Sequence, residues 1–207
     1  MKILVVDEHS IVREGVRRLF SEIQDALIFE ATNGDEALAI IRKKRPKLVL
    51  LDLNLRGIGG LELLRLMIAE DKKICVVVFS VHAEPVYAMR ALRLGARAYV
   101  SKRAGVDELV TAVKEVIEGR RYVEREIAAE LAIAQCVSDA EDPLRQLTTR
   151  EIELLRLLGE GQTLTEIART MGVAYKTVAN ACSKVKSKLG VKRTADLIRL
   201  SIQLKRS

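Results

Sequence analysis

Charged side chains stand at the ends of three short apolar runs, and their types suggest phosphoryl chemistry. Asp7 and Glu8 follow the first run, whereas Asp52 and Lys102 end the second and the third. Short, β-branched apolar runs predict buried parallel strands, and ligands of open parallel sheets bind at the carboxyl ends of the strands. Three carboxylates there could hold a divalent cation such as Mg²⁺, and the lysine could neutralise a phosphoryl oxygen. We therefore expect that Asp52 is itself phosphorylated.

Other polar residues are expected at the same rim. Ser80 ends a further apolar run and could donate its hydroxyl to the phosphoryl group. One acid at the end of a strand is often only a helix cap or a solvated loop residue. Five such residues at the carboxyl ends of strands in one sheet are not expected by coincidence. His9 and His82 lie near the same rim and are interpreted as bystanders that could tune access.

Charge is distributed unevenly along the 207 residues, whose length allows one large domain or two small ones. Residues 1–120 carry a net charge of +3, residues 121–143 carry −4 and residues 144–207 carry +8. A basic C-terminal third is the electrostatic footprint of a nucleic-acid binder.

Cysteine usage and hydropathy favour a cytoplasmic protein without a membrane partner. Cys75, Cys136 and Cys182 are isolated and have neither metal-site nor disulfide spacing, which fits a reduced compartment. The N-terminus runs straight into an expected strand without a signal peptide. No stretch approaches the roughly 18 apolar residues of a membrane span.

Residues 1–120 alternate between strand-like and helix-like patterns. Strands are expected near 2–6, 27–31, 47–51, 74–78 and 97–100, and helices near 10–22, 35–45, 59–70, 84–93 and 106–118. Five βα units predict an α/β fold with a doubly wound, five-stranded parallel sheet and right-handed crossovers.

Residues 121–143 are expected to form a linker, with a short helix near 124–136 and a polar, proline-stopped stretch at 138–143. Residues 144–207 predict an all-α domain of four helices. Their expected ranges are about 148–158, 163–172, 174–188 and 193–204. Thr148 and Glu151 have the spacing of a capping box. Two short helices, a tight turn at Gly172 and a basic third helix are typical of a helix-turn-helix.

Residues 1–120 resemble the receiver domain of two-component response regulators. The matching residues are Asp7, Glu8, Asp52, Ser80, Tyr99 and Lys102. The resemblance implies a flavodoxin-like fold with Asp52 as the phosphoacceptor. It also implies Mg²⁺ bound by Asp7, Glu8, Asp52 and the backbone carbonyl of Asn54. Two departures are Glu8, where Asp is commoner, and Arg103, where many receivers have proline.

The resemblance further implies a switch, although Tyr99 by itself also fits a half-buried strand residue. In receivers the phosphorylated state draws the hydroxyl residue, here Ser80, inward. The aromatic ring, here Tyr99, follows. This movement biases the equilibrium between two states of the face that the expected helix near 84–93, the strand near 97–100 and the helix near 106–118 form.

Residues 147–191 resemble the LuxR-type helix-turn-helix, and together with the receiver they indicate a regulator of the NarL/FixJ type. The matching stretches are 147–151, Gly161, 166–168, 177–178 and 188–191. In that family the third helix enters the major groove of double-stranded DNA, and the fourth often mediates dimerisation. The residues expected to contact DNA are Lys176, Thr177, Ala179, Asn180, Ser183, Lys184 and Lys186. Asn180 could read adenine, but Ala179 and Ala181 replace the usual Lys and His, so the operator of relatives cannot be carried over.

The leading hypothesis is a transcription regulator that is switched when a histidine kinase phosphorylates Asp52. Its expected partners are the kinase, DNA, a second copy of the chain and RNA polymerase. The acidic linker could hold the two domains together before phosphorylation. One alternative is a DNA-binding regulator that needs no phosphate. Another is a phosphatase of the haloacid-dehalogenase type, but Asn54 stands where that enzyme needs its second acid, so we expect no enzyme beyond slow autodephosphorylation.

Overall fold

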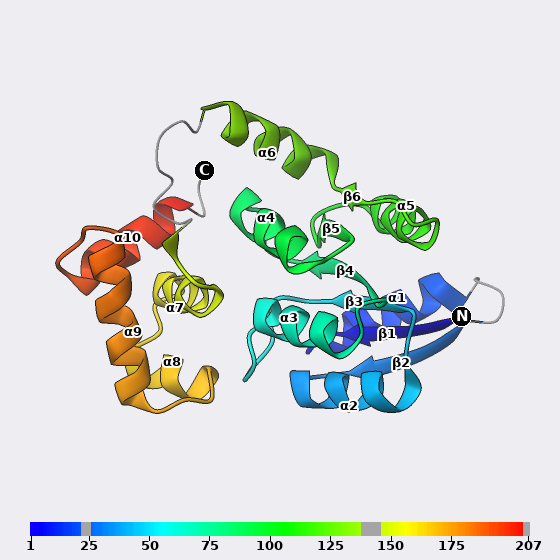
Figure 1. Cartoon of the computed structure of the whole chain (residues 1–207), viewed down its shortest axis with the longest axis horizontal. Helices are drawn as coiled ribbons and strands as arrows, with labels where there is room; N and C mark the ends of the chain where they lie inside the picture. The colour runs from blue at the N-terminus through cyan, green and yellow to red at the C-terminus, as the bar shows by residue number, and fades with distance from the viewer. Residues whose placement is uncertain (22–25, 138–145, 205–207) are drawn as a thin grey trace. The chain divides into compact units, whose positions relative to one another are not determined.

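Six parallel strands form the centre of the N-terminal part of the computed structural model (Figure 1). They are β1 Lys2–Val6, β2 Leu27–Ala31, β3 Leu48–Leu51, β4 Cys75–Ser80, β5 Ala98–Ser101 and β6 Tyr122–Val123. Their order in the sheet is β2-β1-β3-β4-β5-β6, and all neighbours are parallel. The structure describes residues 1–21, 26–137 and 146–204. The α/β fold with its five expected strands is confirmed.

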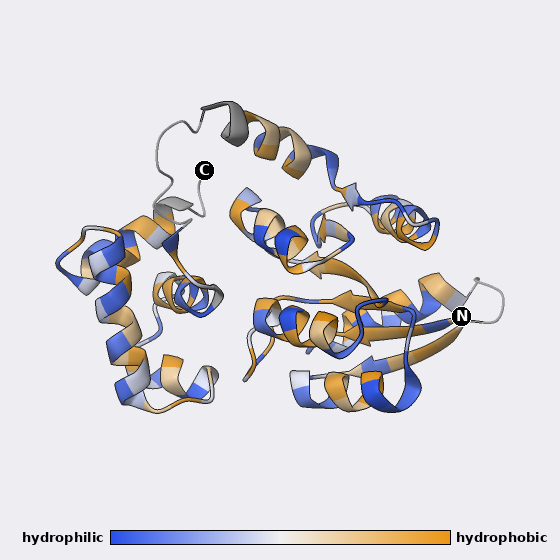
Figure 2. Ribbon diagram, in the orientation of Figure 1, coloured by the Kyte–Doolittle hydropathy of each residue, from blue (hydrophilic) through white to orange (hydrophobic). Residues whose placement is uncertain are grey.

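Five helices connect these strands in turn. They are α1 Ser10–Ser21, α2 Gly34–Lys44, α3 Gly60–Glu70, α4 Pro85–Leu94 and α5 Val106–Ile117. Alternate strand residues such as Ile3 and Val5 share one core with Val16 of α1 and Val113 of α5. α2 packs against α3, and α3 packs against α4. Because both faces of the sheet are buried, the central strands are almost wholly hydrophobic (Figure 2).

The sixth strand corrects the expectation of a five-stranded sheet. Tyr122 and Val123 pair with Ala98 and Tyr99 of β5, inside the stretch that the sequence assigned to the linker. A strand of two residues has too few positions for a hydrophobic period, so the sequence carries no signal for it. β6 is followed by α6 Arg125–Val137, and the first compact unit of the chain runs from Met1 to Leu131.

The second compact unit, Ala132–Ser207, contains α7 Thr149–Gly159, α8 Leu164–Thr170, α9 Tyr175–Lys188 and α10 Thr194–Leu204. These are the four helices expected from the sequence. Thr148 and Glu151 form the expected capping box, and Gly172 takes a left-handed φ of 64° between α8 and α9. The polar stretch expected at 138–143 lies outside the described residues. Among the residues that are described, no helix has both the length and the apolar character needed to span a membrane.

One glycine brings the start of α3 close to the end of β3. A Cβ on Gly60 would lie 2.3 Å from the Leu53 Cα and 2.8 Å from the Asp52 carbonyl oxygen. The Gly60 N–H donates to the Leu53 carbonyl at 3.2 Å. Only a residue without a side chain fits this approach, which holds the backbone directly after Asp52.

Candidate functional site

The charged ends of β1, β3 and β5 meet at one point. Lys102 Nζ donates to Asp7 Oδ2 at 2.5 Å and to Asp52 Oδ2 at 2.6 Å. The side chains of Asp7 and Asp52 are 3% and 0% exposed, and that of Lys102 is 11% exposed. Lys102 has one positive charge to offset the two carboxylates. Because water screens buried charges little, the site keeps an attraction for a further cation.

Strand pairing explains this convergence. Val6 of β1 is in register with Leu51 of β3, so the residues that follow them, Asp7 and Asp52, stand side by side. The Asp52 N–H donates to the Val6 carbonyl at 2.9 Å and continues the pairing. Asp52 Oδ1, the carboxylate oxygen that Lys102 does not contact, accepts the backbone N–H of Asn54 at 3.1 Å.

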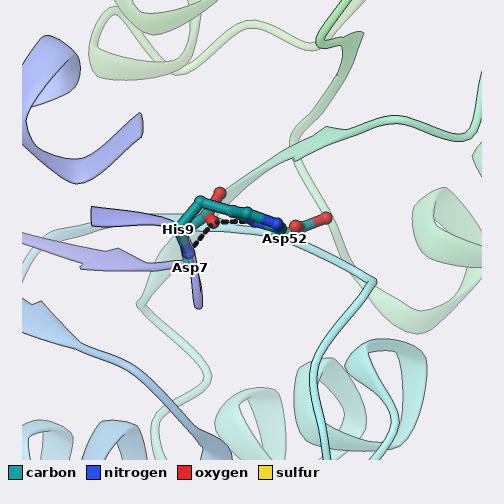
Figure 3. A group of neighbouring side chains, drawn as sticks. All are labelled: Asp7, His9 and Asp52. Atoms are coloured by element: carbon teal, nitrogen blue, oxygen red, sulfur yellow. Dashed lines mark hydrogen bonds and ion pairs between the residues drawn. The ribbon is translucent and has the colours of Figure 1, made fainter. Parts of the chain in front are cut away.

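His9 lies beside the two carboxylates (Figure 3). Its backbone N–H donates to Asp7 Oδ1 at 2.8 Å, and its Nδ1 lies 3.1 Å from the same oxygen. One ligand atom from each of Asp7, His9 and Asp52 lies within 4.8 Å of the others. Two carboxylates and an imidazole fit a divalent cation, and the carboxylate oxygens suit Mg²⁺. His9, which the sequence predicts only as a bystander, stands two residues after Asp7 and can reach its carboxylate.

Glu8 is turned toward a different partner. Its carboxylate accepts the backbone N–H of Arg56 and lies 3.2 Å from the Arg56 Nε. Arg13 Nη1 donates to the carbonyls of Asp7 and Glu8 at 2.9 and 3.2 Å, and its Nε donates to Glu30 at 2.9 Å. These contacts of Arg13 and Arg56 could not be predicted from the sequence, because they depend on tertiary neighbours and not on local spacing.

Ser80 and Tyr99 are joined through the backbone of His82. The Ser80 hydroxyl accepts the His82 N–H at 3.4 Å, and the Tyr99 hydroxyl donates to the His82 carbonyl at 2.7 Å. Tyr99 is fully buried rather than half-buried. Burial raises the pKa of the Tyr99 phenol well above its ordinary value, so the group stays neutral and remains a donor. The His82 ring stacks on Tyr87 of α4 with centroids 4.7 Å apart.

In the second unit, α9 turns one face to the core and leaves the other open. Val178, Cys182 and Val185 are buried at helical spacing. Of the residues expected to contact DNA, Lys176, Thr177, Asn180, Ser183 and Lys184 are exposed, and Ala179 and Lys186 are partly buried. Tyr175, at the start of α9, is 55% exposed.

A charged contact fixes α9 against α7. Lys188 Nζ donates to Glu151 Oε2 at 2.6 Å, and the same oxygen accepts the Thr148 N–H at 2.6 Å. Burial by itself would raise the pKa of Glu151, but Lys188 and Thr148 outweigh it and hold that pKa below its ordinary value.

Each of the two parts of the chain matches a known protein family. Residues 3–114 match the family model of the response regulator receiver domain, and residues 145–201 match that of bacterial regulatory proteins of the luxR family. Response regulator UvrY of Escherichia coli K12 is 31% identical over 98% of this chain and 94% of its own length. The chain belongs to the response regulators. The transcriptional activator protein ExaE of Pseudomonas putida is 36% identical to this response regulator over 98% of the chain and 96% of its own length.

Solved structures support the same fold for the response regulator. RcsB of Salmonella typhimurium matches with a TM-score of 0.78 and 21% identity, over 99% of this chain and 98% of RcsB. A LuxR-family two-component response regulator from Aurantimonas is 35% identical over 65% of this chain and 97% of its own, with a TM-score of 0.62.

Proposed function

We propose that this response regulator controls transcription and is switched by phosphorylation of Asp52. The observation that carries the proposal is the bridge from Lys102 to Asp7 and Asp52. It stands in a chain that combines a receiver domain with a luxR-family domain. A buried carboxylate beside a lysine can act as a nucleophile toward a phosphoryl group whose oxygens the lysine then neutralises.

Asp52 would attack the phosphorus atom of a phosphohistidine, and the histidine would leave with its electron pair. Lys102 would exchange its contact with Asp52 for a phosphoryl oxygen, and the Ser80 hydroxyl would donate to another. Bound Mg²⁺ would supply positive charge at the phosphoryl oxygens. The candidate ligands are Asp7, Glu8, Asp52 and the backbone carbonyl of Asn54. Glu8 would join them only after releasing Arg56.

The proposed switch uses the link between Ser80 and Tyr99. When the Ser80 hydroxyl turns to the phosphoryl group, it gives up the His82 N–H. The His82 carbonyl holds the Tyr99 hydroxyl, so a shift of this backbone reaches the aromatic ring. The resulting movement of the backbone after β4 and of the Tyr99 ring in β5 would bias the protein toward its active state.

A histidine kinase is the proposed phosphoryl donor. Ile11 is 78% exposed, Val106 is 63% exposed and Val81 is 44% exposed. They begin α1, begin α5 and follow β4, at the carboxyl edge of the sheet that also carries Asp52. Exposed apolar side chains around a polar site support a protein partner that docks there.

Double-stranded DNA is the proposed target of α9, read by Asn180 and held by lysines. Solved structures of RcsB are described as bound to DNA as dimers and bound to promoters with a phosphomimetic. By analogy we propose a homodimer on DNA, acting in the cytoplasm. We also propose RNA polymerase as a partner, on the ground that the relative ExaE is named a transcriptional activator. Beyond accepting the phosphoryl group, we propose only slow autodephosphorylation.

Intact mass after incubation with Mg²⁺ and acetyl phosphate tests the proposal. Wild type should gain one phosphoryl group, and light scattering should then detect a shift toward dimer. Asp52→Asn should show neither change. If wild type gains no phosphoryl group and still binds DNA, the regulator works without phosphate. Rapid turnover of a phosphomonoester would instead favour a phosphatase.

A further inference from the structure

Glu124 is a buried acid outside the group around Asp52. It directly follows β6 and is only 7% exposed. Its Oε2 accepts the Ser101 backbone N–H at 2.6 Å, and its Oε1 accepts the Ser101 hydroxyl at 3.3 Å. A buried carboxylate is costly unless its oxygens are hydrogen-bonded, so these two bonds fix the side chain of Glu124.

The backbone of Glu124 belongs to two elements at once. Its N–H donates to the Tyr99 carbonyl at 3.0 Å and extends the pairing of β6 with β5. Its carbonyl accepts the Ala128 N–H at 2.8 Å, a bond that opens α6. The division between the two compact units falls within α6, after Leu131. Glu124 therefore joins a strand of the phosphoryl site to the helix that leads along the chain into the second unit.

The same contacts brace the turn that carries Lys102. Ser101 precedes Lys102, and its hydroxyl also accepts the N–H of Arg103, on the other side of Lys102, at 3.2 Å. The Lys102 N–H itself donates to the Ser80 carbonyl at 2.7 Å. The backbone before Lys102 is thus bound to Glu124 directly, and the backbone after it is bound through the Ser101 hydroxyl.

A cavity of about 520 Å³ lies between this turn and the start of α6. Its lining includes Ser101, Arg103 and Ala104 from the turn, and Arg125, Glu126 and Glu130 from α6. Side-chain packing across the cavity is incomplete, so the hydrogen bonds of Glu124 carry a larger share of the connection between the two elements.

We propose that Glu124 is a positioning residue that couples Lys102 to α6. The proposal rests on phosphorylation of Asp52 as described above. When Lys102 exchanges a carboxylate for a phosphoryl oxygen, the turn around it shifts. Glu124 follows Ser101, and the first turn of α6 follows Glu124. The state of the phosphoryl site thereby reaches the chain segment that enters the DNA-binding unit.

Hydrogen exchange measured by mass spectrometry on the full-length protein tests this coupling. Addition of Mg²⁺ and beryllofluoride to wild type should change exchange at residues 80–84 and at α6 amides 125–131, each by about threefold or more. Glu124→Ala should keep the response at 80–84 and lose it in α6. Glu124→Gln should restore the α6 response, because its amide can accept the Ser101 N–H and donate to the Ser101 hydroxyl.

Glu126→Ala is the matched control. It removes the same charge from the first turn of α6, but at an exposed side chain, and it should respond as wild type does. A wild-type α6 response in Glu124→Ala, or its loss in Glu126→Ala as well, would overturn the coupling.

Two further outcomes keep the test decisive. If wild type shows no response even at 80–84, the proposed phosphorylation switch has failed, independently of Glu124. If Glu124→Ala does not fold, Ser101→Ala replaces it. That variant loses the hydroxyl between Glu124 and Arg103 and should reduce the α6 response at least about twofold, whereas an unchanged response would contradict the coupling.

Discussion

Lys102 is the cation between two buried carboxylates, and its removal has a calculable consequence. In Lys102→Met, Asp7 and Asp52 lose their shared partner, and breaking such a buried pair costs about 3–5 kcal/mol of unfolding free energy. We expect this loss in urea unfolding without divalent cations. Added Mg²⁺ should restore more stability to the variant than to wild type, because two uncompensated acids attract it more strongly.

Lys43→Met is the control for this change, since Lys43 is exposed on α2. It should unfold as wild type does, with the same Mg²⁺ dependence. If the unfolding free energy of Lys102→Met also equals that of wild type at every Mg²⁺ concentration, Lys102 does not offset negative charge on Asp7 and Asp52 in the folded protein.

The convergence of Asp7, Asp52 and Lys102 could be predicted, because parallel strands bring their carboxyl ends to one edge. The contact of Glu8 with Arg56 could not, because it depends on the path of the loop after β3 and on one choice of side-chain rotamer. The same holds for Arg13, whose guanidinium reaches back from α1 to the carbonyl of Asp7.

Among the elements, the approach of α3 to β3 depends on Gly60. In Gly60→Ala the new Cβ would meet backbone atoms of Leu53 and Asp52, which cannot move aside as a flexible side chain could. We expect a loss of about 1–3 kcal/mol in urea unfolding and slower phosphorylation of Asp52, measured by intact mass. Gly15→Ala, at an open helical position, should instead stabilise the protein by about 0.5–1 kcal/mol. Equal stability of the two variants would contradict the close packing at Gly60.

The contact of α7 with α9 should make the second unit sensitive to acid. The pKa of Glu151 is lowered in the folded state, so its contribution is present above its ordinary pKa of 4.5 and is lost as pH falls through the lower, folded value. Glu151→Gln should cost about 1–2 kcal/mol at pH 7, and the difference from wild type should vanish in acid. NMR resonances of α7 and α9 in the full-length protein report this unfolding.

Glu166→Gln offers the comparison, because Glu166 closes the capping box of α8 from an exposed position and its pKa is lowered mainly by the Thr163 backbone N–H. Its effect should be smaller. A pH-independent difference between Glu151→Gln and wild type would mean that the ion pair with Lys188 does not stabilise the unit.

Elements of four or more residues could be predicted from their hydrophobic pattern, and the two-residue strand β6 could not. Both capping boxes stand in the sequence as Thr-x-x-Glu, and the second helix and the basic third helix follow from the residues around Gly172. β6 is held by its pairing with β5 and by the side chain of Glu124, which are long-range contacts. Residues 121–124 are predicted as part of a linker from their composition, and composition carries no information about pairing with a distant strand.

For the molecule as a whole, the net charge differs between the two ends of the chain. Residues 144–207 carry a net charge of +8, against +3 for the longer segment 1–120. The proposed phosphoryl site needs a local balance of acidic and basic side chains, whereas DNA is attracted by the summed positive charge of a surface. Binding should therefore depend steeply on salt, and only the lysines that neutralise phosphates should contribute to that dependence.

Lys176→Ala and Lys184→Ala separate this contribution, because both lysines are exposed on α9. Each variant should weaken binding to every DNA sequence and reduce the slope of log affinity against log salt by about 0.9, measured by fluorescence anisotropy. Asn180→Ala should leave the slope unchanged and lessen the preference among sequences. Lys72→Ala removes an equal charge from the turn before β4 and should alter neither quantity. Were Lys72→Ala to reduce the slope as much as Lys184→Ala does, general positive charge rather than the open face of α9 would account for DNA binding.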